Sequence, residues 1–442
     1  MRIQRGHGEV AAGVLDAGLG SAATFCMGFY AARSFDPITL GAYGLVFTAF
    51  VVATRFPSQL IFKPAEILTA TLPEETRLGM LRRSLPLGMG PAFAAAVAMV
   101  LWALLAPASV SPTVVTALSV TGMLTAFISP IQDHVRFMLH IGRASWGAAA
   151  MSGMLVGVVL LSLRLLPEWG VSTPWVPFGA LALGNTVSLC GGLWMIHRRG
   201  GSSSGPSLTF RALTPSGAWL LLIALLPTGA AFVCAALMLH LAGPAAMGYA
   251  EASRVLGQPP WVLSLGLSAV LGPRSIRAAQ QGDLARARSV SRLFAVIMLG
   301  IGLPYVALVG IPWSWNPLTS LVPNAYEVPD LLLLSVFGSL LIGMDWPYRS
   351  ELIGAGRQTT LAKLESVANL ARIAIAGTAG AIGAFAIPIG YVCLAVVRSL
   401  GYRISLRPIY RPRADAGSPE PRAPQPRPGA MLPYEETGRP AS

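Results

Sequence analysis

Among the charged side chains within or at the ends of the long apolar stretches of this 442-residue sequence, seven are the residues best placed to do chemistry. A charge inside a membrane is costly, so it faces a watery cavity or a partner and often marks a transport pathway. Guanidinium groups suit phosphate because their planar fork donates two hydrogen bonds at once. The seven are Arg33, Arg55, Arg254, Arg349, Asp16, Glu251 and Asp345.

Three arginines are candidates for binding an anionic headgroup. Arg55 and Arg254 lie well inside apolar stretches, and Arg33 lies at the end of one. The alternative for Arg55 is an interior pair with an acid or with carbonyl groups. The alternative for Arg254 is a partnership with Glu251, three residues before it on the same helical face.

The other four charges are candidates for ion coupling or for charge in a cavity. A carboxylate in a partly dry cleft can change its protonation state as the cleft opens and closes, which makes Asp16 a candidate coupling site. Its position only a turn or two inside the membrane interface instead favours a solvated carboxylate. Glu251, Asp345 and Arg349 are candidate cavity charges, and Asp345 and Arg349, four residues apart, can also pair with each other.

The sequence offers no metal, disulfide or catalytic pattern. Its four cysteines all lie in apolar stretches, and there is no CxxC and no cluster of histidines. A membrane polymerase or glycosyltransferase would need a sizeable loop with acidic, arginine or histidine groups, whereas the longest candidate, about 311–328, offers Glu327 and no histidine. We therefore expect a protein that is not an enzyme and that binds no cofactor or metal.

Composition predicts an all-α polytopic membrane protein. The chain is 54% hydrophobic and only 12% charged, against roughly 25% charged in soluble domains. Its net charge of +13 comes almost wholly from arginine, which indicates membrane orientation and contact with anionic lipid, and not nucleic-acid binding. No cleavable signal peptide is evident.

About twelve apolar stretches are long enough to cross a bilayer, at roughly 20 residues each. The eleventh is interrupted by Lys363, Glu365 and Arg372. The pair Pro259–Pro260 in the eighth predicts a kink, just over one turn after Arg254. The twelve lie near 10–32, 38–62, 85–106, 113–135, 144–166, 174–197, 215–242, 246–272, 290–312, 329–354, 360–383 and 386–403.

Basic residues concentrate in the even-numbered connectors, which predicts that both termini and these connectors are cytoplasmic. Among the odd-numbered connectors only Arg33 and Arg164 appear. The even connectors carry Lys63, Arg77, Arg82, Arg83, Arg136, Arg143, Arg198, Arg199, Arg211, Arg274, Arg277, Arg286, Arg288, Arg292 and Arg357.

The two halves resemble each other, which predicts two pseudo-symmetric six-helix lobes with the site between them. Pro64 and Pro273 are 209 residues apart, as are Arg83 and Arg292. We assign residues 1–200 to an N-terminal lobe, 201–214 to a cytoplasmic linker and 215–403 to a C-terminal lobe. Residues 404–442, rich in proline and arginine, are expected to be a disordered cytoplasmic tail.

Several stretches resemble the polysaccharide and lipid-linked oligosaccharide flippases of the MATE-like (multidrug/oligosaccharidyl-lipid/polysaccharide) superfamily. They are Tyr30–Leu45 (YAARSFDPITLGAYGL), Tyr249–Arg254 (YAEASR), Pro273 with Gly282-Asp283, and Gln132–Arg136 (QDHVR) followed by Gly142-Arg143. The resemblance covers about 1–403. It implies a V-shaped pair of lobes around a cavity that opens alternately to the two sides, with cavity arginines on helices 2 and 8 that match Arg55 and Arg254. Helix 1 departs from the pattern because it has no arginine at its middle.

The resemblance implies a carrier of polyprenyl-(pyro)phosphate-linked oligosaccharide in the bacterial cytoplasmic membrane, serving surface polysaccharide synthesis. The expected partners are that substrate, membrane lipids, H⁺ or Na⁺ and other polysaccharide-assembly proteins, with a monomeric chain and no nucleic acid. A cation-coupled multidrug antiporter of the same superfamily is the alternative, although a cationic cleft repels organic cations.

Overall fold

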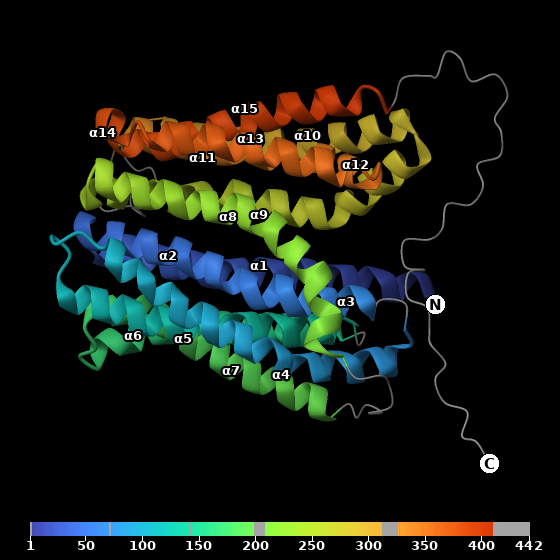
Figure 1. The fold of residues 1–442 in the computed structure, drawn as a ribbon, viewed down its shortest axis with the longest axis horizontal. Helices are drawn as coiled ribbons and strands as arrows, with labels where there is room; N and C mark the ends of the chain where they lie inside the picture. The colour runs from blue at the N-terminus through green and yellow to red at the C-terminus, as the bar shows by residue number, and fades with distance from the viewer. Residues whose placement is uncertain are drawn as a thin grey trace.

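The computed structural model describes residues 2–69, 72–141, 144–198, 208–311, 326 and 328–409, without the side chains of residues 2–10 and Ala269. The described part is built from helices that run roughly parallel in two side-by-side bundles (Figure 1). The helices are α1 (Arg2–Ser34), α2 (Pro37–Pro57), α3 (Lys63–Leu68), α4 (Glu74–Met99), α5 (Pro112–Ile141), α6 (Ser145–Glu168), α7 (Val176–Arg198), α8 (Phe210–Leu241), α9 (Pro244–Gln281), α10 (Leu284–Gly310), α11 (Pro329–Gly343), α12 (Trp346–Gly354), α13 (Gln358–Ala376), α14 (Ala379–Ile382) and α15 (Ala386–Leu406).

The prediction of an all-α membrane protein is confirmed. Ten of the described helical stretches are long and apolar enough to cross a membrane, and α9 makes an eleventh if its two parts form one span. Those parts meet at 50° between Ser268 and Val270, about two turns beyond Pro259–Pro260. The remaining expected span, 360–383, corresponds to α13. This segment is helical, but its three charged residues set it apart from the apolar spans.

Buried partners explain how the charged helix α13 fits among apolar ones. Glu365 forms an ion pair with Arg398 of α15 and accepts a hydrogen bond from the Tyr402 hydroxyl at 2.6 Å. The Arg372 guanidinium lies 4.4 Å from the centre of the Tyr391 ring. Because both buried charges, Glu365 and Arg372, meet a partner on α15, α13 packs inside its bundle against α15 and α8.

Helix ends follow the local sequence signals. Asp36 caps α2 by accepting hydrogen bonds from the backbone nitrogens of Ile38 and Thr39, and Pro37 occupies the first turn. Gly282 ends α9 in the left-handed conformation at φ 67°, and the Asp283 side chain then caps α10. Helices α9 and α10 therefore form a hairpin, and basic residues flank its turn.

Helices α1–α7 make up one bundle, and α9–α15 the other, while α8 runs from the first to the second (Figure 1). Near its start, Gly217 of α8 lies against the backbone of Leu60. Further along, α8 packs against α13 and α9. The helix begins at Phe210, so the last residues of the expected linker are helical, while residues 201–207 and the tail from 410 onward lie outside the described residues.

The two ends of the molecule differ in charge. We call the end with the α3–α4 and α9–α10 connections the basic end, because it carries the exposed Arg274, Arg277, Arg286, Arg288 and Arg292. The other end, with the starts of α2 and α9, is the far end. The placement of the basic end in the cytoplasm stays a prediction.

The bundles meet closely at the far end, where glycines allow the backbones of two helices to approach each other. A β-carbon at Gly248 of α9 would overlap the carbonyl oxygen of Pro37, and one at Gly41 of α2 would overlap that of Pro244. The Tyr326 hydroxyl also donates a 2.8 Å hydrogen bond to the Phe35 carbonyl across this contact. The structure is thus a form in which the two bundles are in contact at the far end.

We expect Gly248→Ala to separate the bundles at the far end, since the added methyl group has no room between α2 and α9. Spin labels at Arg164 and His240, which are exposed at this end on different bundles, should report a longer distance in the variant. Gly229→Ala in α8 is the control, because nothing lies within 4 Å of its β-carbon position. An unchanged distance in the Gly248 variant would show that this contact does not hold the bundles together.

Candidate binding site between the bundles

Arg254 lies at the contact between the bundles and is held from both sides. Its Nε donates to Glu251 Oε2 at 2.8 Å and its Nη2 to Glu251 Oε1 at 2.5 Å. Its guanidinium carbon lies 4.5 Å from the centre of the ring of Phe47, which belongs to α2 of the other bundle. The sequence-based alternative, a partnership of Arg254 with Glu251, is therefore realised in this structure.

The position of the Glu251–Arg254 pair follows from the glycines of α2. Gly44 has no side chain, so the β- and γ-carbons of Glu251 come within 3.3 Å of where its β-carbon would be. Glu251 is fully buried there. The pair still leaves donors available, because a guanidinium has five N–H groups and Glu251 takes two of them.

Arg55 lies eleven residues after Gly44 on α2, which is about three helical turns, so it shares the face that α2 turns toward α9. It is partly buried and forms no hydrogen bond or ion pair with the described residues; Asp133 of α5 acts on it as a neighbouring charge. Pro57 and a π-helical segment, Ser58–Phe62, follow directly. Such irregular segments are common at functional sites.

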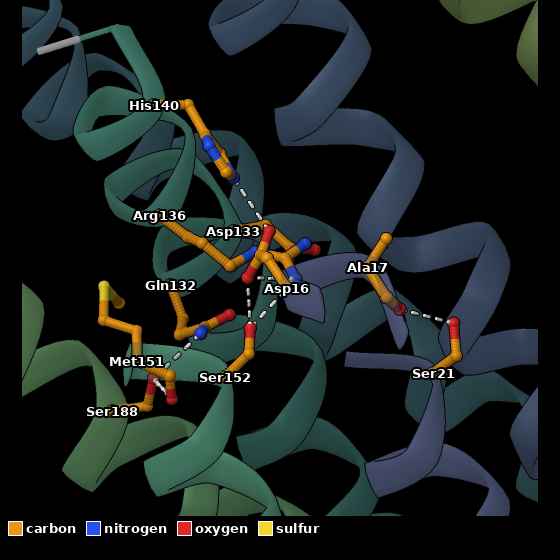
Figure 2. A network of polar contacts seen from close by, with 10 residues as sticks. All are labelled: Asp16, Ala17, Ser21, Gln132, Asp133, Arg136, His140, Met151, Ser152 and Ser188. Carbon is orange, nitrogen blue, oxygen red and sulfur yellow. Dashed lines mark hydrogen bonds and ion pairs between the residues drawn. The ribbon is translucent and has the colours of Figure 1, made fainter. Parts of the chain in front are cut away.

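Asp16 is the centre of a buried polar network in the first bundle (Figure 2). It accepts hydrogen bonds from Ser152 of α6 at 2.5 Å and from His140 of α5 at 2.8 Å. Arg136 lies 3.6 Å away and also pairs with Asp133 at 2.8 Å. Asp16 is only 5% exposed, so the expectation of a solvated carboxylate is wrong: α1 turns this side chain inward against α5 and α6.

Solved structures with this arrangement of helices are membrane transporters. A multidrug resistance MATE family transporter of the MOP superfamily, in an inward-facing conformation, matches over 89% of this chain and 96% of its own, with TM-score 0.73 and 14% identity. A MOP superfamily transporter from Pyrococcus furiosus matches with TM-score 0.63 and 14% identity over 91% and 95%. The lipid II flippase MurJ, in an inward closed conformation, matches with TM-score 0.64 and 12% identity over 90% and 87%.

The chain has the MATE-like transporter fold. No family model matches its sequence, and no match to a curated protein sequence is significant. At 12–14% identity the likeness establishes the fold and not a substrate. The expectation of a MATE-like architecture is confirmed.

The other candidate charges lie away from Arg254 and Arg55. Arg33 is exposed at the end of α1, 5.6 Å from the centre of the Phe29 ring. Asp345 is buried at the break between α11 and α12 and accepts a hydrogen bond from Ser399 of α15. The expected pairing of Asp345 with Arg349 is not formed, because the Arg349 guanidinium lies over the Trp346 ring at 5.1 Å.

Sequence reasoning missed the partners that make these sites. His140 and Ser152 are more than 120 residues from Asp16 in the chain, and Phe47 is 207 residues from Arg254. A single sequence carries no signal for such pairings. The only local hint was the presence of polar residues within apolar helices, which in lipid need a partner on a neighbouring helix.

We expect Asp16→Ala to destabilise the protein by about 2 kcal/mol, because it leaves the buried Ser152 hydroxyl and the partly buried His140 without their acceptor. Asp133→Ala is the matched control: its side chain is 55% exposed and its ion pair with Arg136 should be worth at most about 1 kcal/mol. Thermal unfolding in detergent measures both. Equal losses in the two variants would contradict a central role for the Asp16 network.

Proposed function

We propose that this protein is a flippase that moves a polyprenyl-(pyro)phosphate-linked oligosaccharide across the bacterial cytoplasmic membrane by alternating access, for the synthesis of a surface polysaccharide. The observation that carries the proposal is Arg55, a guanidinium inside a membrane helix, on the face turned toward the other bundle, without a hydrogen bond or ion pair to the described residues. A cation at such a place needs an anionic partner.

The chemistry of this substrate fits what the site offers. An anionic, hydroxylated head cannot cross hydrocarbon unaided, whereas a polyprenyl tail can remain in the bilayer. The carrier therefore has to supply donors and water to the head, and no bond has to break. Arg55 and the remaining N–H groups of Arg254 supply donors whose geometry suits phosphate oxygens.

The way the bundles touch supports alternating access. At the far end the two bundles meet where the glycines Gly41 and Gly248 let two backbones approach closely. They also meet where the Phe47 ring packs against the Arg254 guanidinium. Separating the bundles there would take Phe47 away from Arg254 and leave the Glu251–Arg254 pair intact on α9. The site would then be reached from the far end, and the head would leave on that side. Asp16 is the proposed site of coupling to H⁺ or Na⁺.

We expect Arg55→Ala and Arg254→Ala each to reduce the rate of flipping at least about ten-fold. Each substitution removes at least one charge-assisted hydrogen bond to the phosphate, and the loss of one such bond accounts for an effect of this size. The measurement is movement of a fluorescent polyprenyl-pyrophosphate oligosaccharide in vesicles that contain the purified protein. Arg164→Ala is the control, because that arginine is exposed at the far end and pairs with Glu168. Normal flipping by both site variants would refute the assignment of the site.

A multidrug antiporter is the alternative function, and transport of a cationic drug separates the two. The same vesicles, given a proton or a sodium gradient, should not move ethidium, since the unpaired charge at Arg55 repels an organic cation. Gradient-driven ethidium transport would favour the antiporter over the flippase.

A further inference from the structure

One buried arginine of the second bundle has no anion beside it. Arg372 of α13 is 6% exposed and forms no hydrogen bond or ion pair with the described residues through its side chain. Its guanidinium lies over the ring of Tyr391 from α15, 4.4 Å from the ring centre. The face of a ring attracts a cation but does not neutralise it, so this guanidinium still lacks a counterion.

The buried acids of the same bundle are engaged elsewhere. Among the described residues from α9 onward, each of them has another partner: Glu251 pairs with Arg254, Asp345 accepts from Ser399, Glu351 accepts from Ser291, and Glu365 pairs with Arg398. The anion that Arg372 needs is therefore not supplied by a carboxylate of the described bundle.

Arg372 faces the interior of its bundle and keeps free donors there. Val367 and Leu370 are 56% and 65% exposed, and the helical period places them on the side of α13 opposite to Arg372. Of the three guanidinium nitrogens only Nε is fully enclosed. The two terminal nitrogens also have no hydrogen-bond partner among the described residues, but they retain accessible surface, so they can donate to a molecule inside the bundle.

Tyr391 connects Arg372 to Arg254. The Tyr391 side chain is partly buried, its hydroxyl forms no hydrogen bond with the described residues, and it is an electrostatic neighbour of Arg254. Arg254 in turn leaves three of its five N–H groups free of Glu251. Two guanidinium groups and a hydroxyl thus lie close together with a single carboxylate. Such a set of donors suits an oxyanion, because each oxygen of a phosphate can accept several hydrogen bonds.

These groups lie in the half of the molecule toward the far end. Arg372 is four residues before the end of α13 and Tyr391 five residues after the start of α15, and Gly380 of the intervening α14 lies against the carbonyl oxygen where α8 ends (Figure 1). Arg254 is about 15 Å along α9 from the far end, and Arg55 about 27 Å along α2. The order from the basic end to the far end is therefore Arg55, Arg254, Arg372.

We propose that Arg372, Tyr391 and Arg254 form an oxyanion-binding site, and that it receives the phosphate of the lipid-linked head after Arg55, on the way to the far end. The identity of this ligand rests on the proposed transport function, whereas the existence of the site does not. With three arginines in this order, the phosphate passes from cation to cation and is never left in hydrocarbon.

Binding of inorganic pyrophosphate tests the site itself. The purified full chain in detergent is titrated by calorimetry at physiological salt, which screens the exposed arginines. The wild type should bind pyrophosphate, and Arg372→Gln should weaken binding at least about ten-fold. Tyr391→Phe, which keeps the ring beside Arg372, should weaken it about ten-fold by removing the hydroxyl donor.

Arg403→Gln is the matched control. The Arg403 guanidinium also lies over a tyrosine ring, that of Tyr348 at 5.2 Å, but it is exposed near the basic end of α15, so this variant should bind as the wild type does. Absence of binding by the wild type would overturn the proposal. Binding by Tyr391→Phe equal to that of the wild type would also overturn it, and this result does not depend on whether Arg372→Gln folds.

Flipping in vesicles tests the ligand. Arg372→Gln and Tyr391→Phe should each slow the movement of the fluorescent polyprenyl-pyrophosphate oligosaccharide at least about ten-fold. Weak pyrophosphate binding together with a wild-type rate of flipping would identify the ligand as a free anion and overturn the assignment to the transported head. If the wild type does not move this lipid, the proposed transport function fails, while the calorimetric result still decides whether the site exists.

Discussion

The free-energy cost of a charge in hydrocarbon is the constraint on which this structure depends. Apolar helix faces do not distinguish one neighbour from another in lipid, because the lipid chains are as apolar as the helices. Buried polar pairs do distinguish them. Asp16 joins α1 to α5 and α6, and Glu365 joins α13 to α15. These pairs help to specify which helices lie together within each bundle.

The contact between the bundles is made differently from the contacts within them. It uses glycines at which two backbones approach closely, and a guanidinium that lies over a ring of the other bundle. The acidic partner of that guanidinium is on its own helix, α9. Separation of the bundles therefore does not leave a buried charge unpaired, and this keeps the cost of a conformational change low.

Helix α2 contributes to two sites of opposite character. One face carries Gly44 and Arg55 and is turned toward α9, where we place the anionic headgroup. Another carries Ala53 and Phe56 and lines an apolar cavity that is open to the bilayer. Two such faces on one helix suit the proposed substrate, because its anionic head and its lipid tail require different surroundings.

The sequence by itself determined the class of protein, the positions of most helices and the charges that matter. Long apolar stretches have few alternatives to membrane helices, and Asp36 and Gly282 mark helix ends through local backbone chemistry. The same local rules placed Glu251 beside Arg254. They also showed that the stretch around Lys363, Glu365 and Arg372 was unusual for a span.

Only the tertiary structure decided what each charge does. Asp16 is buried because His140 and Ser152, far away in the chain, come together around it. Asp345 turns to Ser399, and Arg349 to Trp346, although the two are spaced to pair with each other. Nothing local distinguishes these outcomes. Hydrogen bonds and ring contacts across neighbouring helices depend on which helices pack together, and that is a property of the whole bundle.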